Sequence, residues 1–248
     1  MLINTVILML RDALPIALLM SFLLLAFRLQ RKTLVVLLLS TAITTALLVL
    51  LRNSVSDTFD GAGYEWLTVA LLLIAYLFAL LSLDFRAYRS SAIIAAVPVI
   101  SLHLADFMLY LFAFGSHSER LPGILVGSVL GSGISLSLAM LLVVLLSPYR
   151  TTLAMKSLWV LFMAAQASGA VPLLQQTGVI DESVALWDSS VIISDASEYG
   201  HLLKALLAYE SQPDLPYLLT WLALVGLGQC MVLRHHFLFR SSPEGASS

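Results

Sequence analysis

Two short stretches place ionisable side chains inside apolar runs, where charge is costly and usually serves chemistry. The first, LRDALPIALL, contains Arg11, Asp12 and Pro15. Proline has no N–H to donate to the carbonyl of Arg11, so this oxygen is left free in the same turn as the Asp12 carboxylate. A carboxylate beside a free carbonyl makes a candidate cation site. The alternative is an Arg–Asp pair that snorkels outward and only anchors the helix end.

The second stretch, LHLADFMLYLF, contains His103 and Asp106. Residues three apart share one helix face, so an imidazole nitrogen and a carboxylate oxygen are presented together. This combination is a half-site for a transition metal. The alternative is a His–Asp pair that only fixes helix packing. Glu65, at the mouth of the third apolar run, is a further candidate for collecting cations, or else a solvated glutamate at the membrane surface.

The elements that must position these side chains are membrane-spanning helices. Hydrophobic residues make up 60% of the 248 residues and charged residues 11%, which leaves too little polar surface for a water-soluble domain. A span needs about 20 apolar residues. The runs of about this length are 6–27, 34–51, 66–83, 92–114, 122–146, 153–172 and 214–233. The sequence therefore predicts an all-α integral membrane protein, a single domain over residues 1–248 embedded in a lipid bilayer.

The charges between the runs predict the orientation. Acidic residues follow the second and sixth runs: Asp57, Asp60, Asp181, Glu182 and Asp188. Basic residues follow the odd-numbered runs: Arg28, Arg31, Lys32, Arg86, Arg89, Arg150, Lys156, Arg234 and Arg240. Because positive residues stay in the cytoplasm, the N-terminus is expected outside and the C-terminus inside.

Small residues recur at four-residue spacing in the fifth run. They are Gly123, Gly127, Gly131, Ser135 and Ala139. A ridge of small side chains lets another helix approach closely, so we expect this ridge to serve packing.

The segment 173–213, which precedes the last span, contains SEYGHLLKALLAYE. Its apolar residues recur at helical spacing: Tyr199, Leu202, Leu203, Leu206 and Leu207. This pattern predicts an amphipathic helix at the outer surface. Such a helix either covers the outer vestibule or docks a periplasmic partner.

Several classes of function are not indicated. The chain has no nucleophile elbow, phosphate loop or paired-cysteine site, so we expect neither an enzyme nor a permanently bound cofactor. The net charge of −2 and the lack of a basic tract argue against nucleic acid as a partner. Methionines in the apolar runs are scattered rather than paired, which argues against a thioether path for copper. Examples are Met9, Met20, Met108 and Met140.

The two stretches resemble the paired motifs of a known family, the high-affinity, oxidase-dependent iron permeases. The likeness extends to GYEWLTVALLLIA, to GILVGSVLG, and to the long stretch from SGAVPLLQQTGVIDES to PDLPYLLTWL. The resemblance implies seven spans in a bacterial inner membrane: inverted repeats over about 6–83 and 92–172, then a last span at 214–233. It also implies iron as the transported ion and a periplasmic ferroxidase or metal-binding protein as a partner.

The family carries ferric iron on glutamates of an Arg-Glu-Gly-Leu-Glu motif, and this chain departs from that motif. The four glutamate positions are occupied by Asp12, Pro15, His103 and Asp106, and Leu102 replaces the second arginine. A nitrogen ligand among fewer carboxylates favours a softer transition metal. We therefore predict a metal site formed by Asp12, His103 and Asp106 with Glu65, in a permease that works by alternating access. The alternative is a non-transporting accessory subunit of a larger membrane complex.

Overall fold

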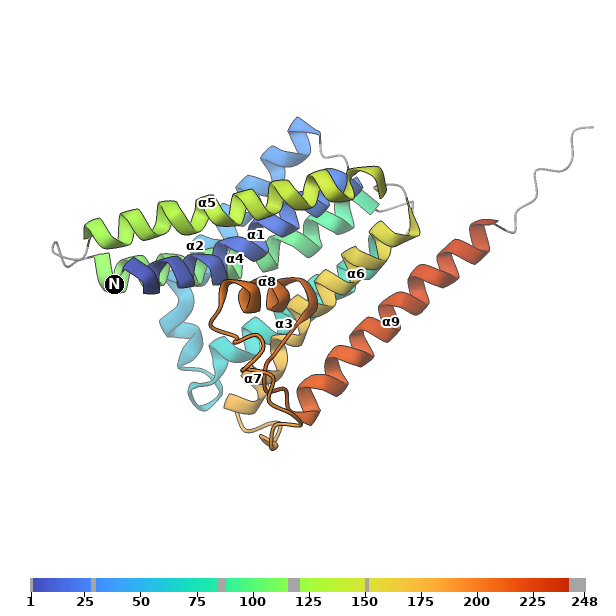
Figure 1. Cartoon of the computed structure of the whole chain (residues 1–248). Coiled ribbons are helices and arrows are strands. Elements are labelled where there is room, and N and C mark those ends of the chain that lie inside the picture. The colour runs from blue at the N-terminus through green and yellow to red at the C-terminus, as the bar shows by residue number, and fades with distance from the viewer. Residues whose placement is uncertain (1, 28–29, 84–87, 116–120, 150–151, 241–248) are drawn as a thin grey trace, which may run out of the picture.

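Helices make up most of the residues that the computed structural model describes, which are 2–27, 30–83, 88–115, 121–149 and 152–240 (Figure 1). Arg28, Arg86 and Arg150, used above to predict the orientation, lie outside these residues. The helices are α1 (Leu2–Phe27), α2 (Arg31–Ser56), α3 (Gly63–Leu81), α4 (Tyr88–Gly115), α5 (Leu121–Leu146), α6 (Leu153–Ser168), α7 (Ala170–Gln176), α8 (Glu198–Leu207) and α9 (Leu215–Arg240), with 3₁₀ turns at Phe59–Gly61 and Ser147–Tyr149.

Seven segments of the described chain are long and apolar enough to cross a bilayer, with α6 and α7 together forming the sixth. This confirms the predicted all-α, seven-span membrane fold. Leucine and alanine dominate the spans and are good helix formers, so α1 and α4 continue unbroken through Pro15 and Pro98.

Three helices form the centre of the bundle. Half or more of the spanning residues of α1, α4 and α6 are buried, against 17–28% for α2, α3, α5 and α9. The core is aromatic where α1 meets α6: the Phe22 and Phe162 ring centroids are 5.2 Å apart, and Trp159 lies edge-on to Phe22. The outer helices expose apolar side chains, as expected of helices that face lipid.

The helix pairs show how the centre is assembled. Helix α1 packs along α5 and α4, α2 packs on α4, α3 on α4 and α6, and α9 on α6 (Figure 1). Exchanging the two predicted repeats relates the α1–α5 contact to the α2–α4 contact. It also relates α3–α4 to α1–α6, yet α1 makes much less contact with α6 than α3 makes with α4. These contacts do not establish the inverted repeat, which stays a prediction. The orientation in the membrane also stays a prediction.

The predicted ridge of small residues packs as expected. Gly127, Gly131, Ser135 and Ala139 are buried, and the Ser21 hydroxyl of α1 donates to the carbonyl of Ala139 at 3.3 Å. Small side chains let the two backbones approach, which is why α1 and α5 make the closest pair in the bundle.

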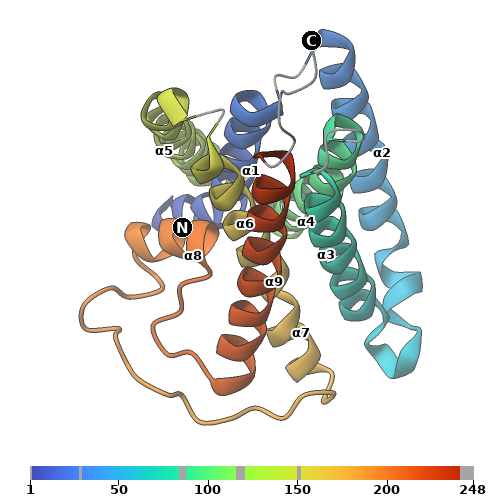
Figure 2. The same ribbon diagram turned by 90° about the vertical axis from the view of Figure 1, so that its right-hand side faces the viewer.

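The long connection between α7 and α9 crosses one end of the bundle and contains α8 (Figure 2). The Ser197 hydroxyl caps α8 by accepting from the N–H of Gly200, and the helix ends where Ala208 takes a left-handed conformation. The predicted amphipathic helix is confirmed over Glu198–Leu207. Tyr199, assigned to the apolar face, is instead exposed, because Gly200 and Ala205 are the residues that face inward.

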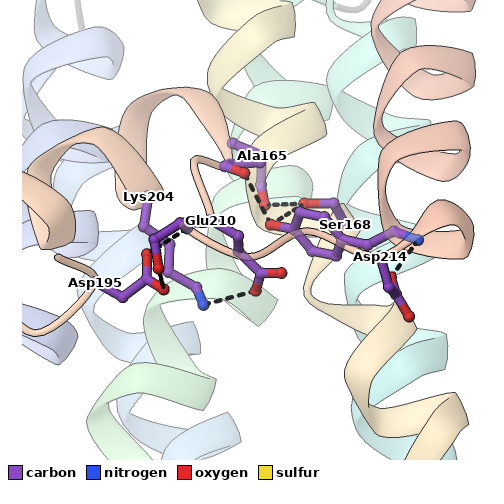
Figure 3. A network of polar contacts seen from close by, with 9 residues as sticks. Ala165, Ser168, Asp195, Lys204, Glu210 and Asp214 are labelled. Atoms are coloured by element: carbon purple, nitrogen blue, oxygen red, sulfur yellow. Dashed lines mark hydrogen bonds and ion pairs between the residues drawn. The ribbon is translucent and has the colours of Figure 1, made fainter. Parts of the chain in front are cut away.

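Hydrogen bonds tie this connection to itself and to the bundle (Figure 3). The Asp195 carboxylate accepts from both the N–H and the hydroxyl of Ser211, at 2.8 and 2.6 Å. Lys204 pairs with Glu210 at 2.9 Å. The Tyr217 hydroxyl at the start of α9 donates to the carbonyl of Ala208 at 3.1 Å. Helix α8 is thereby held against α1 and α6.

Candidate functional site

Asp12 is buried within α1, with only 2% of its surface exposed. Its partner is the preceding residue: Arg11 Nε donates to Oδ1 at 3.0 Å and Nη2 donates to Oδ2 at 3.3 Å. The Arg11 side chain is 54% exposed. A long, mostly exposed guanidinium therefore reaches back to neutralise a buried carboxylate, as in the anchoring pair described for this stretch.

Asp12 also faces His103 of α4. His103 Nδ1 lies 3.7 Å from Asp12 Oδ1, and the imidazole is 24% exposed. On its other side, His103 Nε2 is 3.4 Å from Oε1 of Gln166 on α6. The Gln166 amide nitrogen donates to the carbonyl of Ala205 on α8 at 2.9 Å. A chain of polar contacts thus joins α1, α4, α6 and α8.

The direction of this chain assigns the donor between His103 and Gln166. Because the Gln166 N–H₂ group donates to the carbonyl of Ala205, its carbonyl oxygen faces His103 and accepts from Nε2–H. The other ring nitrogen, Nδ1, faces Asp12 Oδ1 at 3.7 Å. A proton or a metal ion can lie between these two atoms.

A cavity of about 380 Å³ adjoins this pair, bounded by α1, α4 and α5. Most of its wall is apolar. The lining residues include Met9, Asp12, Ile16, His103, Phe107 and Ser132. The pair is therefore reached from a space large enough for an ion and several waters.

The other two predicted ligands lie elsewhere. Asp106 is exposed on α4 and does not line the cavity, although it follows His103 by less than one turn. Glu65 lies in the first turn of α3, half-buried, and its Oε2 has no hydrogen-bond partner among the described residues. Within those residues no group of three or more His, Cys, Asp or Glu is placed to hold a metal. The structure brings together Asp12 and His103 of the four.

Two residues at the site were not found by sequence reasoning. Gln166 is the sole amide in the apolar run 153–172, and this isolation is the signal that marks a polar contact inside a bundle. Met9 precedes Asp12 by three residues and so shares its helix face. Its role depends on α5, whose position the sequence pattern does not give.

The chain is thus a multi-pass helical membrane protein with a polar pair beside a half-open cavity between α1, α4 and α5. Comparison with protein-family models, with curated proteins and with solved structures found no match. The function must be inferred from the pair and its cavity.

Proposed function

We propose that the protein is a permease for a transition-metal ion, which binds transiently between Asp12 and His103. The observation that carries the proposal is that Asp12 Oδ1 and His103 Nδ1, from two different helices, face each other at 3.7 Å. Metal bonds to imidazole nitrogen and to carboxylate oxygen are both about 2.0–2.2 Å long, so a metal fits between two such atoms at about 3–4 Å. The metal is cargo in this proposal, not a resident cofactor.

The groups around the pair suit transient binding. Gln166 orients the imidazole, as outer-shell partners of metal-binding histidines do. Arg11 competes with the metal for the Asp12 carboxylate. Its side chain is half-exposed and has room to swing away. Release of an ion requires weak or replaceable ligands, and Arg11 supplies the replacement when the ion leaves.

The resemblance of the two motif stretches to iron permeases supports transport and suggests its route. In this proposal the two three-span repeats rock against one another about the pair and expose the site to each side in turn. Glu65 and Asp106, which lie outside the cavity, gather cations on the way to it. The setting proposed is a bacterial inner membrane with a periplasmic ferroxidase or metal-binding protein as donor.

One observation favours the accessory-subunit alternative. Arg11 already makes two hydrogen bonds to Asp12, so the carboxylate is satisfied without any metal. In that case the polar chain through His103 and Gln166 serves only to lock α1, α4 and α6 together. A locked bundle fits a subunit that gives shape to a larger membrane complex.

Metal uptake by vesicles containing the purified protein tests the choice. We expect uptake of at least one of ferrous, cuprous or zinc ions above that of empty vesicles. Asp12→Asn should abolish this uptake without reducing the folded protein recovered, because it removes a ligand and also a buried charge. Asp57→Asn, in an exposed loop, is the matched control and should retain uptake.

Two results would reject transport. One is wild-type uptake equal to that of empty vesicles for every ion. The other is uptake that Asp12→Asn leaves unchanged. Recovery of a larger complex from native membranes, measured in the same variant, then tests the accessory-subunit reading directly.

A further inference from the structure

We propose that the cavity is selective for a soft monovalent metal ion, cuprous copper, with the Met9 thioether as a third ligand beside Asp12 and His103. This inference rests on the proposed function because it uses the same pair, and it adds the class of ion. It also revises the sequence prediction against copper. One thioether placed beside an imidazole and a carboxylate replaces the expected row of paired methionines.

Met9 lies where a third ligand is needed. It precedes Asp12 by three residues on the same face of α1, is 7% exposed, and lines the cavity together with Asp12 and His103. The Ser132 hydroxyl of α5 donates to Met9 Sδ at 3.9 Å, and Ser132 also lines the cavity. The sulfur is therefore held at the cavity wall by a contact with α5.

The facing helix is shaped to admit this side chain. A Cβ added to Gly131 of α5 would lie 2.4 Å from Met9 Cβ and 3.4 Å from Met9 Cγ. Any other residue at this position would have to displace Met9. Gly133, two residues further along the same helix, has nothing within 4 Å of an added Cβ. The close approach at Gly131 is therefore specific to the turn that carries Met9.

Two of the three donors, the thioether and the imidazole, suit a soft ion, and only one donor is anionic. Thioether sulfur and imidazole nitrogen suit cuprous copper, whereas ferric iron prefers several anionic oxygens. The one carboxylate, Asp12, is balanced by Arg11 at 3.0 Å. An imidazole that binds a metal is neutral, so the wall offers a monovalent ion little net charge and a trivalent ion far too little.

The apolar part of the cavity wall also favours a soft monovalent ion. Ile16 and Phe107 belong to an apolar lining, which supplies no partners for the water shell that a small divalent ion keeps. A monovalent soft ion gives up its water more readily to sulfur and nitrogen ligands. Apolar walls with one thioether, one imidazole and one carboxylate already paired with Arg11 therefore select against hydrated divalent ions.

The test measures binding of silver, a redox-stable substitute for cuprous copper, and of zinc to the purified full-length protein in nanodiscs. All proteins carry Cys230→Ser, because the single cysteine is free and exposed on α9 and would bind silver itself. Met9→Leu keeps the volume and removes the sulfur. Met140→Leu, at a 62% exposed position on α5, is the matched control.

We expect Met9→Leu to weaken silver binding at least about tenfold and zinc binding less than twofold, with Met140→Leu unchanged, as for removal of one soft ligand. X-ray absorption of bound silver should show a sulfur neighbour that Met9→Leu removes, and this readout remains decisive if the variant is poorly stable. Silver affinity equal in wild type and a folded Met9→Leu overturns the inference. So does tighter binding of zinc than of silver.

Transport is read separately, so the two proposals fail in different ways. Met9-dependent silver binding without uptake in vesicles rejects the permease and keeps the soft site. Uptake of ferrous or zinc ions that Met9→Leu does not change keeps the permease and rejects the soft site.

Discussion

The two polar positions of α4 face different surroundings, although only three residues separate them. His103 points to Asp12 and Gln166, and each polar group there has a partner within 3.7 Å. Asp106 is exposed and has no hydrogen bond to that group, although its charge interacts with Asp12 and His103 as well as with Arg52 of α2. In that second region the buried atoms Tyr64 Oη and Glu65 Oε2 have no hydrogen-bond partner among the described residues.

The difference concerns how charge is tolerated in a bilayer. We call the region around Asp12 complete, because each of its polar side chains has a polar neighbour within 3.7 Å. The region around Glu65 is incomplete, since a buried polar group without a partner costs about 1–3 kcal/mol. Arg52 lies over the Tyr64 ring, 5.1 Å from its centroid, and leaves the hydroxyl unpaired. The polar groups of the first region are paired with one another, whereas the second region has buried polar atoms without a partner among the described residues.

The largest difference between the two regions is expected when each aspartate is neutralised. Asp12→Asn should lower metal uptake more than about 100-fold, because it removes the anionic ligand itself and exceeds the 10–100-fold loss typical of outer-shell changes. Asp106→Asn should lower uptake less than about threefold, since it only weakens cation gathering. Initial rates in vesicles measure both. Equal losses would place Asp106 in the site and erase the distinction.

Gln166 tests whether the complete region depends on its outer contacts. Gln166→Leu removes the acceptor for His103 Nε2, so the imidazole can turn its lone pair away from Asp12. Uptake or metal affinity should fall about 10–100-fold. Gln229→Leu is the control, since that amide also donates to a helix carbonyl, at 3.1 Å, but outside the cavity. Similar effects from both would show that only packing is involved.

The glycine beside Met9 tests how tightly the complete region is packed. Gly131→Ala should lower the free energy of unfolding by about 1–3 kcal/mol, because its Cβ would overlap Met9 and meet the Val6 carbonyl at 3.1 Å. Gly133→Ala, with open space around it in the interior of α5, should leave the free energy of unfolding unchanged or raise it by up to about 1 kcal/mol, because alanine is the better helix former. Unfolding in mild detergent compares the two, and matching values would contradict the close α1–α5 contact.

Two tyrosines on α3 sharpen the contrast between paired and unpaired groups. Tyr76 donates to the carbonyl of Leu224 on α9, so Tyr76→Phe should cost about 1 kcal/mol of unfolding free energy. Tyr64→Phe removes a hydroxyl that has no partner within the described chain and should leave stability equal or slightly higher. A loss at Tyr64 as large as at Tyr76 would mean that the second region is also complete.

The smallest effect is a pH dependence at α8. Burial, with Lys204 nearby, lowers the pKa of the His201 imidazole below its usual value, against the opposing influence of Asp195 and Asp12. The folded state thus favours neutral His201, and the unfolded state gains a proton first as the pH falls through about 6.5. Docking of α8 is therefore strongest above that pH and weakens in acid. Hydrogen exchange of α8 at pH 7.5 and 5.5 measures this, and His201→Gln should remove the dependence.

Much of the fold followed from the sequence because the bilayer leaves few options: apolar runs of sufficient length must be helices. The α8 helix and the small-residue ridge of α5 were also readable, since each is a periodic pattern within one element. The proximity of Asp12 and His103 was expected because both were predicted as ligands of one metal site. Gln166 and Met9 were not recognised. The role of Gln166 depends on how α6 is rotated about its axis, and the role of Met9 depends on where α5 packs against α1. Asp106 shows the same limit, as sharing a face with His103 did not bring it to the cavity.

The contact between Arg11 and Asp12 has a consequence for the insertion of α1 into the membrane during synthesis. Helix α1 is synthesised long before α4 and α6, so Asp12 enters the membrane when His103 and Gln166 do not yet exist. A lone aspartate at a helix centre costs about 2.5–3.5 kcal/mol on insertion. The adjacent Arg11 travels with it and cancels its charge from the start. The nascent helix thus enters the translocon with the counter-ion of Asp12 already in place. Helices α4 and α6 pack later against an ion pair that has already formed.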